Sequence, residues 1–129
     1  MGVNRWRRPV GGWLMRRGDV VWVDLDPVRG SEASKRRPAV VVSNDGANRS
    51  AQGLGRGVVT IVPITSQTKK VYPFQVLLPA KSCGLPKASK AQAEQIRSVA
   101  VQRIGSTAGH LPTNVLASLD DAIRLHLAL

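Results

Sequence analysis

The chain has 129 residues, a length that fits one domain built around a single core of modest size. Its 43% of hydrophobic residues is typical of a folded globular protein and excludes a chain that is disordered as a whole. Lys and Arg number 19 against 8 Asp and Glu, which gives a net charge of +11. This excess favours nucleic acid or an acidic protein as the partner, because neutralising phosphates releases counterions.

Cysteine content and apolar runs exclude further classes. The single cysteine, Cys83, cannot form an internal disulfide, and no Cys or His pair has the spacing of a zinc site. We expect a plain thiol in a reducing compartment, the cytoplasm. The longest apolar runs are far too short to span a membrane.

Residues 1–14 differ from the rest of the chain. They carry Arg5, Arg7 and Arg8 but no apolar segment of a secretory signal. We therefore predict a basic, disordered extension, followed by a single domain over residues 15–129.

The first half of that domain alternates strands and polar loops. Val20–Leu25 is typical of a strand, which Asp26-Pro27 would end. A polar stretch up to Arg37 is expected to be a functional loop, because long connections in compact domains often carry function. The β-branched run Ala39–Ser43 predicts a buried strand. Residues 44–57, rich in Gly, Asn and Ser, are predicted to be a mobile loop.

The second half continues this pattern and ends in a helix. Pro63 in the third predicted strand indicates a sheet edge or a bulge. The further predicted strands are Val58–Thr65, Tyr72–Leu78, Ala91–Ile96 and Ser98–Val101, with a polar loop at Ser66–Val71. Apolar residues at helical spacing then predict an amphipathic C-terminal helix; they are Val115, Leu116, Leu119, Ile123 and Leu127. The class is therefore mostly β with α (α+β), a small barrel or half-open sheet capped by helices.

Familiar catalytic motifs are missing from the sequence. It has no Walker-type glycine loop, no GxSxG elbow and no carboxylate cluster suited to magnesium. Of the two histidines, His110 lies beside Gly109 in a predicted turn and carries no motif, and an ordinary packing or surface role is expected for His126. The remaining candidates for catalysis are arginines and polar side chains in the predicted loops. Such residues suit RNA cleavage, in which the RNA supplies its own 2′-OH nucleophile and the protein stabilises phosphate charge.

Several strings, in order, resemble the MazF/PemK toxin family, and the resemblance covers about residues 16–129. They are Arg17–Pro27, Gly30-Ser31-Glu32, Arg37–Val42, Val62–Ser66, Tyr72–Val76 and Ala93–Ser98. The resemblance implies an SH3-like β-barrel that works as a homodimer without a metal or cofactor. It also implies sequence-specific, ribosome-independent cleavage of single-stranded RNA, here mRNA, held in check by an acidic, MazE-like antitoxin. The expected products carry 2′,3′-cyclic phosphate and 5′-hydroxyl ends.

Site residues follow from the same resemblance. Arg37 and Thr65 match the family's catalytic arginine and threonine, and Glu32 matches a loop glutamate implicated in some members. Because the pKa of arginine is too high for easy proton transfer, we expect Arg37 to act mainly by electrostatic stabilisation. Thr65 would hydrogen-bond a phosphoryl oxygen, and Glu32 would orient Arg37 or take a proton.

Six further residues are candidates for contact with RNA. Lysines in the loop after the third strand would contact backbone phosphates or simply form a solvated surface, and amide side chains could read base edges. The candidates are Ser66, Lys69, Lys70, Asn44, Gln95 and Arg97, the last of which could equally be structural.

Two alternatives share the barrel fold. One is a CcdB-like toxin that binds gyrase and lacks the nuclease residues, and the other is an RNA-binding barrel without catalysis. The presence of both Arg37-Pro38 and Thr65-Ser66 in register with the family pattern favours the nuclease.

Overall fold

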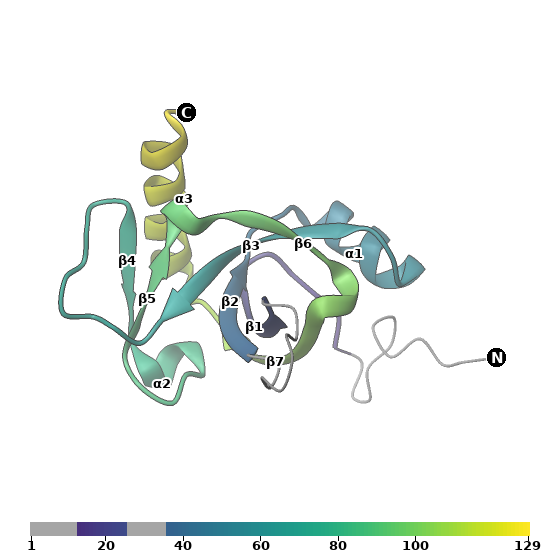
Figure 1. The fold of residues 1–129 in the computed structure, drawn as a ribbon, viewed down its shortest axis with the longest axis horizontal. Helices are drawn as coiled ribbons and strands as arrows, with labels where there is room; N and C mark the ends of the chain where they lie inside the picture. Colours follow the sequence, from purple (N-terminus) through teal and green to yellow (C-terminus); the bar gives the residue numbers. More distant parts are fainter. Residues whose placement is uncertain (1–12, 26–35) are drawn as a thin grey trace, which may run out of the picture.

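A computed structural model describes residues 13–25 and 36–129 of the chain (Figure 1). The elements in chain order are β1 (Asp19–Asp24), β2 (Arg36–Val41), α1 (Asp45–Leu54), β3 (Val58–Thr65), β4 (Gln75–Leu78), α2 (Ala80–Cys83), β5 (Ser89–Gln92), η1 (Ala93–Gln95), β6 (Arg97–Ala100), η2 (Val101–Arg103), β7 (Ile104–His110) and α3 (Thr113–Leu127), where η marks a 3-10 helix.

The strands form one antiparallel, curled sheet. Its order is β4-β5-β3-β2-β1-β7, and β6 pairs with β3 on the same edge as β5. The predicted α+β class with a C-terminal helix is confirmed. Within residues 13–25 and 36–129 no pairing joins β7 to β6, so this part of the sheet stays open and is not a closed barrel.

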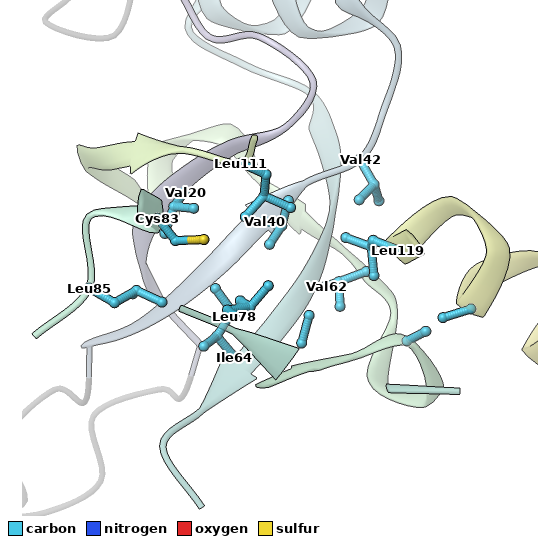
Figure 2. Packing of buried hydrophobic residues seen from close by; sticks show 13 residues of the cluster. Val20, Val40, Val42, Val62, Ile64, Leu78, Cys83, Leu85, Leu111 and Leu119 are labelled. Atoms are coloured by element: carbon cyan, nitrogen blue, oxygen red, sulfur yellow. The ribbon is translucent and has the colours of Figure 1, made fainter. Parts of the chain in front are cut away.

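Two hydrophobic clusters lie on the two faces of the sheet. Neighbouring residues of β2 and β3 enter opposite clusters, because side chains alternate along a strand. Val40 and Val62 pack in the first cluster together with Leu119 of α3 (Figure 2). Val41 and Ile61 pack in the second. Burial on both faces explains the continuous β-branched sequence of these strands.

The C-terminal helix α3 lies against β4 and η1, beside the sheet (Figure 1). Leu119 and Ala122 are its buried residues, which confirms the predicted amphipathic helix. Arg17 fixes it to the start of the domain, because its Nη2 lies 2.7 Å from Asp120 Oδ1 while its Nε donates to the carbonyl oxygen of Val42.

The predicted mobile loop over residues 44–57 is wrong, because most of it is helix α1. Asn44 caps the helix by accepting a hydrogen bond from the Ala47 N–H at 2.8 Å, and Gly55 ends it with a φ of 68°. The side chains that α1 buries include Asn48 and Gln52, whose hydrogen bonds are made to Ser43 and Met15. A buried face that is polar gave no hydrophobic periodicity from which the helix could be predicted.

The strand β7 is not apparent in the sequence, which placed His110 in a turn. Small residues dominate it because α2 approaches closely: a Cβ at Gly109 would lie 2.7 Å from the Cys83 carbonyl oxygen. Gly84 opposite it has a φ of +74°, and a Cβ there would lie 2.1 Å from the Ala108 oxygen. Close backbone packing therefore replaces the β-branched signal.

Most of the predicted N-terminal extension, residues 1–12, lies outside the described residues. Trp13, which the sequence placed in that extension, packs against the second cluster, and its Nε1 lies 3.3 Å from Asp19 Oδ2. In the described ranges, every helix is too short or too polar to cross a bilayer.

Candidate functional site

Arg37 and Thr65 come from neighbouring strands. In the β2–β3 pairing, Ala39 lies opposite Pro63 and Val41 opposite Ile61. Continuing this register by two residues sets Arg37, at the start of β2, opposite Thr65, at the end of β3. Pro38 and Pro63 lack the N–H groups that could extend the hydrogen-bonded ladder to this point.

The two residues also share a face of the sheet. Side chains two residues apart along a strand point to the same face, so Arg37 shares a face with Ala39 and Val41, and Thr65 shares a face with Ile61. Ala39, Val41 and Ile61 pack in the second hydrophobic cluster. Arg37 is exposed and Thr65 is half-buried. The face that is apolar in the middle of β2 and β3 therefore becomes polar and accessible at this end.

The hydroxyl of Thr65 is oriented by its own turn. Its Oγ1 accepts a hydrogen bond from the backbone N–H of Gln67 at 3.2 Å. Because the oxygen is the acceptor in that bond, the hydroxyl hydrogen remains available to a second group. A phosphoryl oxygen is a suitable acceptor for it.

Lys90 lies on the other side of Thr65, as its cross-strand partner in β5. The residue is only 8% exposed. Its Nζ donates to the carbonyl oxygen of Lys70 at 2.5 Å and lies 5.9 Å from the centre of the Tyr72 ring. Arg37, Thr65 and Lys90 thus form one row across β2, β3 and β5.

The loop over residues 66–74 borders this row. Lys70 Nζ lies 4.9 Å from the centre of the Tyr72 ring, which stacks on Phe74 at 5.3 Å between centroids. Ser66 and Lys69 in the same loop are exposed. In residues 13–25 and 36–129, no ion pair joins a carboxylate to Arg37 or to any lysine.

The other predicted site residues are not part of this cluster. Glu32 lies outside the described residues. Asn44 lies beyond the opposite end of β2, where its side chain caps α1. Gln95, in η1, is exposed. Arg97 is exposed and pairs with Ile61, four residues before Thr65 and therefore about 13 Å along the strand.

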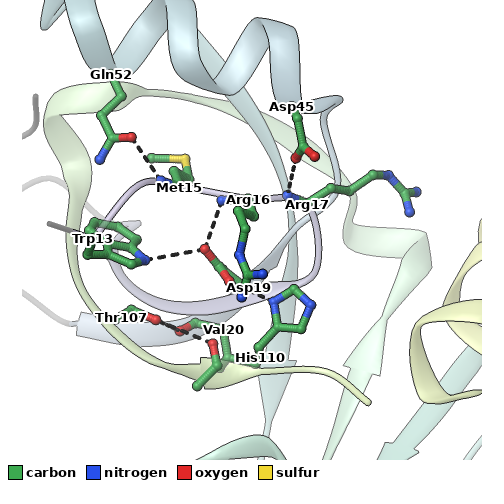
Figure 3. Close-up of polar contacts among 11 residues, drawn as sticks. Trp13, Met15, Arg16, Arg17, Asp19, Val20, Asp45, Gln52, Thr107 and His110 are labelled. Atoms are coloured by element: carbon green, nitrogen blue, oxygen red, sulfur yellow. Dashed lines mark hydrogen bonds and ion pairs between the residues drawn. The ribbon is translucent and has the colours of Figure 1, made fainter. Parts of the chain in front are cut away.

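A second polar cluster surrounds Asp19, which is 2% exposed (Figure 3). Its Oδ1 lies 2.7 Å from His110 Nδ1, and its Oδ2 accepts from the Arg16 backbone N–H at 2.8 Å and from Trp13 Nε1. These contacts join the segment before β1 to the end of β7. They give His110 a structural role, at the end of a strand and not in the turn that the sequence indicated.

Lys90 and Tyr72 are the site residues that sequence reasoning missed. Lys90 directly precedes the predicted strand Ala91–Ile96, whereas the observed strand β5 is Ser89–Gln92, and only the β3–β5 register brings Lys90 beside Thr65. The available signal was chemical: a lysine directly before a buried strand in a chain of high positive charge.

Metal-ligating side chains do not gather in the part of the chain that the structure describes. In it, no three His, Cys, Asp or Glu residues are close enough to hold an ion. The row described above instead offers a guanidinium, a hydroxyl and ammonium groups, which are donors to an anion.

Comparison with known proteins gives consistent matches over nearly the whole chain. The sequence profile of PemK-like, MazF-like toxins of type II toxin–antitoxin systems matches residues 16–127. Endoribonuclease MazF9 of Mycobacterium tuberculosis is 60% identical over 116 residues, which cover 90% of this chain and 98% of that protein. Endoribonuclease EndoA of Bacillus subtilis is 35% identical over 117 residues, with 90% and 97% covered.

Comparison with solved structures leads to the same family. A MazE–MazF crystal structure from Deinococcus radiodurans superimposes with a TM-score of 0.72 at 30% identity, covering 91% of this chain and 98% of that one. A Mycobacterium tuberculosis toxin, MazF-mt6, has a TM-score of 0.69 at 21% identity, with 86% and 97% covered, which shows a similar fold.

Proposed function

The chain belongs to the family of PemK-like, MazF-like toxins of type II toxin–antitoxin systems and is an endoribonuclease, and from this premise we propose that it cuts single-stranded mRNA at short sequence motifs. The toxin domain spans residues 15–129. Cleavage requires neither a metal ion nor the ribosome, and it leaves 2′,3′-cyclic phosphate and 5′-hydroxyl ends.

The observation that carries this proposal is the β2–β3 register, which, continued by two residues, sets Arg37 opposite Thr65 on one face of the sheet. In the reaction, the 2′-oxygen of the ribose attacks the adjacent phosphorus while its proton is removed. The bond from phosphorus to the 5′-oxygen breaks, and that oxygen takes up a proton. Negative charge grows on the non-bridging oxygens, where a guanidinium and a hydroxyl donor stabilise it.

The roles of the site residues follow from their chemistry. Arg37 is always charged and can donate two parallel hydrogen bonds to a phosphate, so it stabilises the developing charge. Thr65 donates its hydroxyl hydrogen to a phosphoryl oxygen, since Gln67 already donates to its oxygen. Glu32 orients Arg37 or takes the 2′-OH proton. Ser66, Lys69 and Lys70 hold the RNA strand beside the cleaved bond.

Partners are proposed from charge and from the relatives. The MazF of Deinococcus radiodurans was crystallised with MazE, and a mycobacterial endoribonuclease was crystallised with its cognate antitoxin. By analogy, an acidic, extended segment of a MazE-like antitoxin would cover Arg37 and the loop lysines of this protein, because it can imitate the charge of RNA. We also propose a homodimer that acts in the cytoplasm.

One incubation tests the activity and its metal independence. A long single-stranded RNA is mixed with the protein in excess EDTA, and the cut ends are sequenced and assayed for cyclic phosphate. The proposal predicts cuts at one recurring motif, with products that a kinase labels at the 5′-hydroxyl without prior phosphatase treatment. The Arg37→Ala protein, folded to the same extent, is the matched control and should leave the RNA intact.

Three results would contradict the proposal. Cleavage that stops in EDTA would show that a metal is required. Products with 5′-phosphate ends would show a different reaction. Undiminished cleavage by the Arg37→Ala protein would remove Arg37 from the mechanism.

A further inference from the structure

Lys90 is a buried lysine without a carboxylate partner among the described residues. It is 8% exposed, and none of the ion pairs between described residues involves it. Removing an ammonium group from water is costly unless hydrogen bonds and opposite charge replace the lost solvation. A lysine in this position therefore points to a function that uses its charge.

The surroundings of Lys90 meet only part of its bonding capacity. The ammonium group has three N–H donors, and its hydrogen bond to the Lys70 carbonyl oxygen uses one of them. The Tyr72 ring adds a cation–π contact at 5.9 Å to its centroid. The remaining donors have no acceptor in the part of the chain that the structure describes.

A second cation converges on the same ring. Lys70 Nζ lies 4.9 Å from the Tyr72 centroid, so two ammonium groups lie close to one aromatic side chain. Two like charges near one ring repel each other, and an anion that binds both relieves this repulsion. This arrangement is suited to one phosphate group that accepts from both lysines.

The position of Lys90 connects this pair to the cleavage site. Lys90 is the cross-strand partner of Thr65, and cross-strand partners have Cβ atoms about 5 Å apart on the same face of the sheet. A phosphate held by Lys90 and Lys70 would therefore lie next to the phosphate held by Thr65 and Arg37. An extended RNA strand presents its phosphates in such a sequence, one per nucleotide.

We propose that Lys90, together with Lys70, forms a subsite for the phosphate that neighbours the cleaved one, so that Lys90 is an RNA-contacting residue. The inference rests on the proposed function, because it assumes that RNA is cut at Arg37 and Thr65. In this role, Lys90 fixes which phosphate of the RNA strand lies at Arg37 and Thr65 before cleavage.

Binding is measured first, with an RNA that carries a 2′-O-methyl group at the cut position and cannot be cleaved. The Lys90→Met protein keeps the length of the side chain but loses its charge, and its affinity should fall about tenfold. The slope of log affinity against log salt should become shallower by about 0.7, the value for one lost contact to a single-stranded phosphate. The matched control, Lys87→Met, removes an exposed lysine outside the row and should change neither quantity.

A second measurement separates this contact from a purely structural role of Lys90 in holding the 66–74 loop. Each phosphate around the cut position is replaced in turn by an uncharged methylphosphonate, and binding is measured with both proteins. At the neighbouring phosphate, the replacement should weaken binding to the wild type about tenfold but hardly affect binding to Lys90→Met. The Lys90→Arg protein should restore the wild-type pattern.

The outcomes are distinct. An unchanged salt slope, or equal methylphosphonate penalties in both proteins at every position, would overturn the proposal and leave Lys90 a structural residue. If wild-type protein neither bound nor cut any RNA, the proposed function would fail instead. A loss of folding in Lys90→Met, seen by circular dichroism, would shift the test to Lys90→Gln and to the Lys70→Met protein, whose exposed lysine should show the same coupling to that phosphate.

Discussion

Two polar clusters of this protein differ in how their charges are matched. Around Asp19, donors from Trp13, Arg16 and His110 satisfy a buried carboxylate, and the contacts are made within the chain (Figure 3). In the row of Arg37, Thr65 and Lys90, the charges are positive and no described carboxylate pairs with them. Both clusters lie at the ends of strands, so their location alone does not distinguish them.

This difference indicates which of the two clusters is available to bind a ligand. A cluster whose hydrogen bonds are complete within the chain contributes to stability and has little to offer a ligand. A cluster of unmatched cations destabilises the free protein through repulsion and becomes favourable when a polyanion binds. The first cluster should therefore control folding, and the second should control RNA cleavage.

The largest effect is expected at Arg37. The Arg37→Ala protein should cut single-stranded RNA at least about 100-fold more slowly, because the guanidinium stabilises charge in the transition state. Since Arg37 is exposed, the melting temperature of the Arg37→Ala protein should stay within about 1–2 °C of the wild-type value. Single-turnover cleavage and a thermal melt of the same sample provide both numbers.

Arg37→Lys sharpens the interpretation of that result. Lysine keeps the charge but cannot form two parallel hydrogen bonds to a phosphate, so its rate should fall between the wild type and Arg37→Ala. A rate equal to that of the wild type would show that geometry at this position is unimportant.

The reverse pattern is expected at Asp19. The Asp19→Ala protein leaves the donors of Trp13, Arg16 and His110 without their acceptor, which should lower the free energy of unfolding by about 2 kcal/mol. Its cleavage rate per folded molecule should be unchanged. Urea unfolding measures the loss. A large drop in rate at full stability would contradict the division between the clusters.

A smaller effect on cleavage is expected at Thr65. The Thr65→Val protein keeps the shape of the side chain but removes the hydroxyl donor, so cleavage should slow about tenfold. Thr65→Ser, which keeps the hydroxyl, is the matched control and should retain most of the rate. Equal rates for the Val and Ser proteins would show that the hydroxyl does not contact the substrate.

The smallest effect concerns Cys83, which lies in neither cluster. Burial raises the pKa of this thiol above its usual value of 9.0, although a hydrogen bond with Ser82 acts in the opposite direction. An alkylating reagent at pH 8 should therefore label the folded protein far more slowly than the urea-unfolded protein. Comparable labelling rates in the two states would contradict the buried placement of the thiol.

The sign of the pH dependence follows from the same shift. The unfolded chain releases the thiol proton at a lower pH than the folded chain does. The contribution of Cys83 to stability is therefore full below pH 9.0 and falls as the pH rises above that value. A Cys83→Ala protein should lack this component of the alkaline loss of stability.

Much of the fold was predictable because its signals are local. The β-branched runs gave β3 with its observed bounds, Val58–Thr65, and the apolar spacing gave the helix α3. Pro63 does not mark a sheet edge, because β3 pairs with β2 on one side and with β6 and then β5 on the other. Helix α1 and strand β7 were missed because a polar buried face and close glycine packing replace the usual apolar patterns.

The site was predictable only in part. Arg37 and Thr65 came from the family resemblance, and whether they act as proposed awaits the experiments above. Lys90 could not be found in this way, because its relation to Thr65 depends on the register of β3 and β5, which connect residues far apart in the chain. Its burial under the 66–74 loop is likewise a tertiary property.

One measurement tests the central claim, that the unmatched cations rather than the completed cluster bind RNA. Uniformly nitrogen-15-labelled protein is titrated with the 2′-O-methyl RNA, and the shifts of its amide signals are mapped onto the structure. The account predicts that the largest shifts occur at Arg37, Thr65, Lys70 and Lys90, with little change at Asp19 and His110. Shifts centred on Asp19 and His110, with the Arg37 row unaffected, would contradict it.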